Sequence, residues 1–210
     1  MFSSVPLMSV FSVLFLVTGV YAVVRLAALA SGVHASVDRA AELSHVVMSV
    51  AMIAMAWGWS GGPSSPSGVL QVVFFGLVGL YFLIGAVRGH RALPASGYHL
   101  VMALAMVWMV ATMPLLMGAA GSSGAAMEGM PWMTSGGSGA TGPADPGAHP
   151  WVLPVSLVLV VLLLAAGVFW AARAARAARG PVGSLLSPRA DAACHAFMSA
   201  GMAWMLAAML

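Results

Sequence analysis

The sequence predicts an all-α membrane protein whose six transmembrane helices form three helical hairpins with pseudo-three-fold symmetry. Of the 210 residues, 61% are hydrophobic and 6% are charged, whereas a soluble domain is about 45–50% apolar and about 25% charged. Apolar runs of about 20 residues, long enough to cross a bilayer, recur along the chain. A motif that occurs three times relates the hairpins to one another. We therefore expect one six-span membrane domain over residues 1–210.

The six predicted spans, taken in order, cover residues 5–30, 43–59, 69–87, 98–117, 151–172 and 192–210. The first lacks a basic start and a clear cleavage site, so we interpret it as a retained membrane helix and not as a secretory signal. Pro63 and Pro66, with neighbouring Gly and Ser, predict a tight turn between the second and third spans. Residues 118–150 are rich in Gly, Ser and Ala, which predicts a flexible extracytoplasmic loop that contains Met.

The basic residues predict the orientation of the spans. All eight are Arg, and they lie in or beside the loops that follow the first, third and fifth spans: Arg25, Arg39, Arg88, Arg91, Arg173, Arg176, Arg179 and Arg189. Basic loops stay in the cytoplasm, so we expect a multi-pass plasma-membrane protein with both termini extracytoplasmic. Eight dispersed cations do not make a nucleic-acid-binding surface, and the lipid bilayer is the expected partner. Three of them, Arg173, Arg176 and Arg179, share one helix side; we expect them to set topology, with anionic lipid binding as the alternative.

The repeated motif has the form H-x2-M-x3-M-x2-M and occurs once in each even-numbered span. Its members are His45, Met48, Met52 and Met55; His99, Met102, Met106 and Met109; and His195, Met198, Met202 and Met205. Helical periodicity keeps the three Met residues within roughly 80° of the His direction, at about 4.5, 10.5 and 15 Å along the axis. The three helices run in the same direction. They can therefore line one axis with a layer of three His at the cytoplasmic end and three layers of Met beyond it.

Stacked thioether layers predict a site for Cu(I). Thioether sulfur is soft, neutral and polarizable, and it prefers Cu(I) to hard cations such as Mg²⁺. No carboxylate lies within the three stripes, which argues against a proton relay or hard-cation transport. We expect a protein that conducts or delivers Cu(I) and is not an enzyme, with a copper donor or acceptor protein as a candidate partner. The sequence contains no P-loop motif, which argues against pumping driven by ATP in this chain alone.

More Met residues follow the fourth span outward. Met113 and Met117 extend it, and Met127, Met130 and Met133 lie in the predicted loop, with His149 further on. These residues are candidates for extracytoplasmic copper capture. Because they lie outside and the His layer lies inside, inward conduction is the favoured direction.

The M-x3-M steps at Met48/Met52, Met102/Met106 and Met198/Met202 resemble the filter helix of the high-affinity copper transporter family. In that family three subunits supply stacked Met triads that pass Cu(I), whereas here one chain would supply all three helices. The resemblance covers the motif alone. The whole chain is also similar to an uncharacterised actinobacterial family of small multi-pass membrane proteins, a resemblance that implies no function.

Three alternatives remain open. Met can fill gaps between packed helices, and the repeat would then record a duplication in a structural or assembly protein. His45, His99 or His195 could instead ligate a b-type haem, although haem does not account for nine aligned Met residues. A copper-dependent redox enzyme or an oxidase-assembly partner is a further alternative. Cys194, the single Cys, lies about 100° off the stripe, and we interpret it as an ordinary membrane-edge residue.

Overall fold

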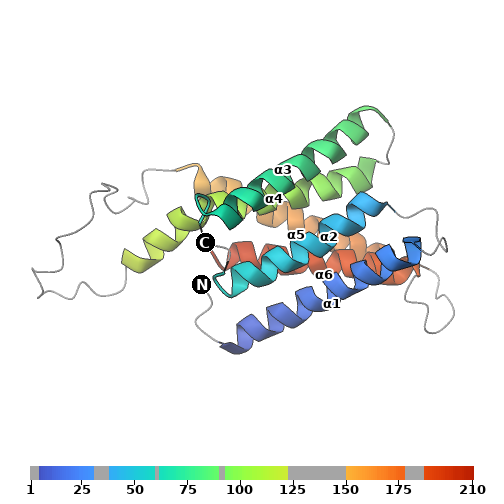
Figure 1. The fold of residues 1–210 in the computed structure, drawn as a ribbon, viewed down its shortest axis with the longest axis horizontal. Helices are drawn as coiled ribbons and strands as arrows, with labels where there is room; N and C mark the ends of the chain where they lie inside the picture. The colour runs from blue at the N-terminus through green and yellow to red at the C-terminus, as the bar shows by residue number, and fades with distance from the viewer. Residues whose placement is uncertain (1–4, 31–37, 60–61, 90–92, 123–149, 178–186) are drawn as a thin grey trace, which may run out of the picture.

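The computed structural model describes residues 5–30, 38–59, 62–89, 93–122, 150–177 and 187–210. Within these ranges the chain folds into six helices and no strand, which confirms the all-α prediction. The helices are α1 (Val5–Ala30), α2 (Arg39–Ala56), α3 (Pro66–Val87), α4 (Leu93–Ser122), α5 (Val152–Arg176) and α6 (Pro188–Ala207) (Figure 1). α4 continues through the first five residues of the predicted loop, where Ala119 and Ala120 favour helix.

Five of these helices are long and apolar enough to cross a membrane, which indicates a lipid-bilayer environment. The qualifying segments are Met8–Leu29, Arg39–Ala56, Pro66–Val87, Pro94–Met113 and Val152–Arg176. α6 is not among them, because Arg189, Asp191 and His195 lower its hydropathy. On length and composition the described residues therefore support five of the six predicted spans.

Short polar residues fix where three of the helices begin. The side chain of Asp38 accepts a hydrogen bond from the Ala40 N–H at the start of α2. Ser65 and Ser187 cap α3 and α6 in the same way, and each is followed by a Pro in the first helical turn. These side chains accept hydrogen bonds from main-chain N–H groups in the first turn that have no partner within the helix. Pro suits this turn because it has no main-chain N–H group. The predicted turn before Pro66 is thus the start of α3.

Consecutive helices pack against each other in pairs. α1 lies against α2, α3 against α4 and α5 against α6, and α6 also contacts α1 while α4 contacts α5 (Figure 1). More than half of the α2 and α4 membrane segments is buried, 56% and 61%, against 22% or less for α1, α3 and α5. Half of the residues of α6 are buried as well. The helices that carry the repeated motif are therefore the inner ones, and the strongly apolar helices face outward.

Candidate metal centre

The nine Met residues of the three motifs lie inside the bundle. Their exposed fractions range from 0 to 3%, and all nine belong to one hydrophobic core cluster that also contains Phe15 and Phe75. Met113, one turn beyond the last motif position of α4, is also buried. Met117 falls within α4, and the other outer candidates, Met127, Met130, Met133 and His149, lie outside the described residues. The structure thus brings together the Met set that the sequence singled out.

The three motif His residues converge at one end of this Met cluster. The ring centroids of His45 and His99 lie 5.0 Å apart, those of His45 and His195 4.7 Å, and those of His99 and His195 5.9 Å. All three side chains are buried. One ring nitrogen from each lies within 4.8 Å of the others, so that the three could hold a single ion. Imidazole nitrogen is a common ligand for soft and borderline metal ions.

Main-chain carbonyls orient two of these rings. Nδ1 of His99 lies 2.8 Å from the carbonyl oxygen of Ala95, and Nδ1 of His195 lies 2.8 Å from that of Asp191. A carbonyl only accepts, so each Nδ1 carries the proton and donates it, which leaves Nε2 as the lone-pair nitrogen. Nε2 of His45 is buried without a hydrogen-bond partner in the described part of the chain. A metal-ligating His typically donates its other ring N–H to a carbonyl or carboxylate, as Nδ1 of His99 and His195 does here.

Aromatic side chains that the sequence did not single out surround the His rings. Phe82 of α3 stacks on His99 with centroids 4.4 Å apart, and Trp170 of α5 lies 4.6 Å from His195. Tyr98 contacts both His99 and His195, and its hydroxyl donates to the His195 carbonyl oxygen at 3.2 Å. The outer helices α3 and α5 therefore each contribute one aromatic ring that packs on a His of the triad. Of these aromatic residues, only Tyr98 could have been connected with the site from the sequence, because it directly precedes His99.

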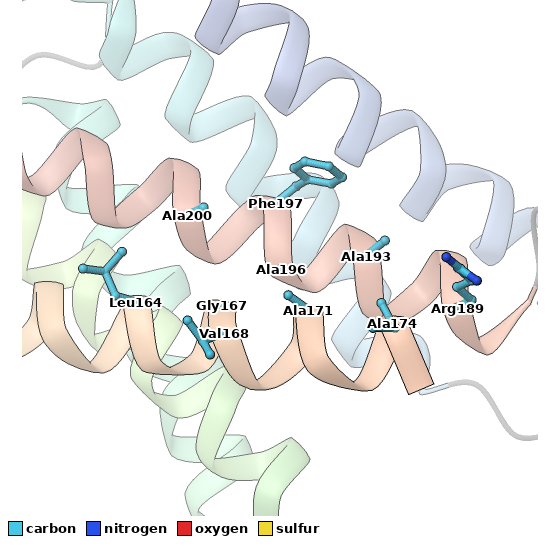
Figure 2. A pocket seen from close by; sticks show the side chains of 11 residues that line it. Leu164, Gly167, Val168, Ala171, Ala174, Arg189, Ala193, Ala196, Phe197 and Ala200 are labelled. Carbon is cyan, nitrogen blue, oxygen red and sulfur yellow. The ribbon is translucent and has the colours of Figure 1, made fainter. Parts of the chain in front are cut away.

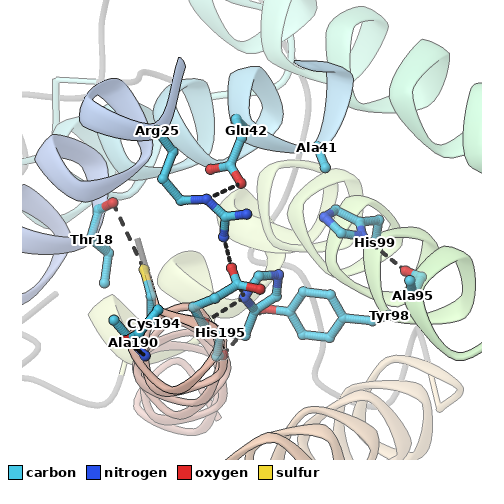
Figure 3. Close-up of polar contacts among 12 residues, drawn as sticks. Thr18, Arg25, Ala41, Glu42, Ala95, Tyr98, His99, Ala190, Cys194 and His195 are labelled. Carbon is cyan, nitrogen blue, oxygen red and sulfur yellow. Dashed lines mark hydrogen bonds and ion pairs between the residues drawn. The ribbon is translucent and has the colours of Figure 1, made fainter. Parts of the chain in front are cut away.

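A partly buried ion-pair cluster lies beside the His rings. Arg25 lies in α1, within the predicted first span, and its Nε lies 3.1 Å from Glu42 Oε1 (Figure 3). Its Nη1 donates to Asp191 Oδ1. Although no carboxylate lies within the motif stripes, Glu42 and Asp191 come three and four residues before His45 and His195. Asp191 Oδ1 is 3.4 Å from His195 Nδ1. Acidic groups thus border the His layer about one helical turn toward the N-termini of α2 and α6.

Cys194 faces away from the His rings. Its thiol is buried and lies 3.9 Å from the carbonyl oxygen of Thr18 on α1. This position matches the sequence interpretation of Cys194 as a residue off the motif stripe.

The outer surface of the α5–α6 pair carries an apolar groove with a volume of about 550 Å³. Small residues, among them Gly167, Ala171 and Ala196, line it, and Arg189 lies at one end (Figure 2). Arg173 and Arg176, two of the three Arg residues that share one helix side, are exposed. Arg179, the third member of that set, lies outside the described residues.

Comparisons with known proteins place the chain in a family. A family model described as "Domain of unknown function (DUF5134)" matches residues 37–209, a range that contains all three motifs. The chain is 34% identical over 173 residues to Uncharacterized protein Rv0970 of Mycobacterium tuberculosis (strain ATCC 25618 / H37Rv) and equally to Uncharacterized protein Mb0995 of Mycobacterium bovis (strain ATCC BAA-935 / AF2122/97). Each alignment covers 79% of this chain and 79% of the relative. No solved structure matches. The similarity to an uncharacterised actinobacterial family is thereby supported, and the chain belongs to the DUF5134 family.

Proposed function

We propose that this protein binds Cu(I) within the membrane and conducts or delivers it through a column of Met triads that ends in a His triad. One observation carries the proposal: three His-headed Met stripes, from three different helices, meet in one buried cluster. The column would hold the ion in neutral, soft ligands away from water. Such ligands suit Cu(I) and leave Mg²⁺ and Ca²⁺ without the oxygen atoms that they prefer.

In this proposal the three helix pairs are hairpins related by a pseudo-three-fold axis, and α6 is the sixth span. The mutual contact of the equivalent His rings supports the axis. The same relation would put equivalent Met residues at one depth in three layers: Met48/Met102/Met198, Met52/Met106/Met202 and Met55/Met109/Met205. The M-x3-M steps would then act as the filter helix of high-affinity copper transporters does, with one chain in place of three subunits.

The same arrangement sets a direction for the ion. By the positive-inside rule, the Arg-bearing loops would put the His end of the column at the cytoplasmic face of the plasma membrane, with both termini outside. An ion would enter past the outer Met residues, pass between Met layers about 4.5–6 Å apart, and reach the His triad. Imidazole is also a competent ligand for copper, so the triad would be the last position before transfer to an acceptor.

Haem binding fits the geometry less well than copper does. His45, His99 and His195 lie in contact with one another, and Phe82 and Trp170 cover two of the rings. A haem needs a flat space between two axial ligands, which would require these rings to separate. We expect purified protein to lack a Soret band, and an absorption spectrum of the protein as isolated tests this expectation.

Metal analysis tests the proposal against the packing alternative. Full-length protein in detergent is loaded with Cu(I) or Ag(I) in the presence of a competing chelator and freed of unbound ion. We expect the wild type to retain stoichiometric metal and the variant with Met52→Leu, Met106→Leu and Met202→Leu to lose most of it. Met8→Leu, outside the motifs, is the matched control and should bind as the wild type does. Wild-type protein without metal would leave the Met residues with a packing role alone.

A further inference from the structure

The apolar groove on the outer surface of the α5–α6 pair, here termed the α5–α6 groove, carries charge at one end only. Residues of α5 between positions 164 and 175 and residues of α6 between positions 189 and 200 line it (Figure 2). Val168 and Phe197 are 70% and 58% exposed, whereas Gly167 is buried, so the large side chains stand at its edges and small residues lie deeper. Among the described residues that line the groove, Arg189 is the only charged one.

The length and position of the groove match one leaflet of a bilayer. Arg189 and Ala200 bound it on α6, and at 1.5 Å per residue they lie about 16 Å apart along the helix axis. One leaflet contributes about 15 Å to a hydrocarbon core of about 30 Å. On α5, which is apolar enough to span a membrane, the groove occupies the half that ends at Arg176. A phospholipid acyl chain therefore fits the groove in both length and depth.

The charge at the end of the groove suits a phosphate. Arg189 is the second residue of α6 and is exposed, so its guanidinium lies where the chain enters the helix. A guanidinium is permanently charged and binds phosphate oxygens in a bidentate geometry. Arg173 and Arg176, also exposed, add positive charge at the same end of the α5–α6 pair. Such a cluster attracts anionic lipids more strongly than zwitterionic ones, whose headgroup carries its own cation.

The same charge disfavours a second copy of the chain as the occupant of the groove. Small residues on a membrane helix allow another helix to approach closely, so a dimer is the main competitor. A two-fold dimer would bring the same surface of both copies together. Arg189 of one copy would then face Arg189 of the other at the same depth, and two like charges repel strongly where little water screens them. A lipid phosphate neutralises this charge instead.

We propose that the α5–α6 groove binds an anionic phospholipid of the leaflet at which α5 ends. One acyl chain lies along the small residues of the groove, and the phosphate lies against Arg189. This site is on the outer surface of the bundle, and its proposed ligand does not depend on whether the Met and His residues bind copper.

Native mass spectrometry of the full-length protein in detergent tests the site. The protein is titrated with phosphatidylglycerol or with phosphatidylcholine, and the lipid-bound fraction gives the affinity for each. Arg189→Gln removes the charge; Arg39→Gln is its matched control, because Arg39 is exposed and precedes His45 by as many residues as Arg189 precedes His195. A second variant, Ala171→Phe with Ala200→Phe, fills the groove from two exposed positions. Ala27→Phe, at an exposed position of α1, is the control for added bulk.

We expect the wild type to prefer phosphatidylglycerol and Arg189→Gln to lower that affinity about fivefold, toward the affinity for phosphatidylcholine. The filled variant should bind less of both lipids, and the two controls should equal the wild type. Equal phosphatidylglycerol affinity in Arg189→Gln and the wild type would overturn the proposal, even if the filled variant did not fold. A dimeric wild type that becomes monomeric when the groove is filled would also overturn it, because a second copy would then occupy the groove.

Discussion

The imidazole rings of His45 and His195 meet edge to face with centroids 4.7 Å apart, although one lies on α2 and the other on the last helix of the chain. His99 of α4 completes the contact at 5.0 Å from His45. The candidate site therefore does not exist in any single helix pair. It is assembled only when the inner helices of all three pairs come together, so the fold and the site depend on the same packing.

Removing the Tyr98 hydroxyl should weaken the site more than the fold. Tyr98 is buried, and its hydroxyl donates to the carbonyl oxygen of His195 at 3.2 Å. Tyr98→Phe keeps the ring that packs on His99 and His195 and removes about 1 kcal/mol of hydrogen bonding. We expect a small fall in the thermal unfolding temperature and a several-fold loss of Cu(I) affinity in chelator competition. Unchanged affinity would mean that Tyr98 does not position His195.

The first turn of α3 packs so closely on the preceding chain turn that Gly68 should not tolerate a side chain. A Cβ at Gly68 would lie 2.2 Å from the main-chain oxygen of Gly62, which cannot move aside as a flexible side chain would. We expect Gly68→Ala to destabilise the protein by about 1–3 kcal/mol, the usual cost of overpacking. Gly76→Ala on the same helix meets no atom within 4 Å and is the control. Thermal unfolding in detergent compares them; equal unfolding temperatures for the two variants would contradict the described turn.

The ligand set should discriminate between ions by softness. Excess Cu(I) should displace Ag(I) from the loaded protein, because both are soft monovalent ions that thioethers accept. Excess Mg²⁺ or Ca²⁺ should displace none, since the buried motif residues offer sulfur and nitrogen but no oxygen ligand. Metal analysis after equilibrium dialysis measures the exchange. Displacement of Ag(I) by Ca²⁺ would point to a site built on Glu42 or Asp191 and away from the Met column.

The helices were predictable because the apolar runs are long and the periodicity of the motif is strong. The α1 boundaries agree with the prediction at both ends, while α4 extends further than expected at each end. Composition does not reveal such extensions, because Ala and Ser occur both in helices and in loops. α6 illustrates a different limit: burial inside the bundle lets a helix carry Asp191 and His195, so its hydropathy falls although its inner face is packed.

The site residues that recur in all three motifs were predictable from the sequence, whereas the contacts that occur only once were not. Equal spacing in three helices identified the His and Met residues without knowledge of their contacts. The contacts of Arg25 with Glu42 and Asp191, and of Phe82 and Trp170 with the His rings, join residues far apart in sequence and occur once each. Only the packing of the helices determines such pairs. The carboxylates did carry a local signal, since they lie one turn before His45 and His195.

X-ray absorption at the copper edge tests the central claim most directly, because it reports which atoms surround the bound ion. We predict that the wild type loaded with Cu(I) gives sulfur scattering from Met, joined by nitrogen scattering from His45, His99 and His195. The chain has a single Cys that faces Thr18, so several sulfur ligands can come only from Met. The sulfur signal should fall sharply, together with the amount of bound copper, when Met52, Met106 and Met202 are replaced by Leu. Protein that takes up no copper, or copper surrounded by oxygen and nitrogen alone, would contradict the account.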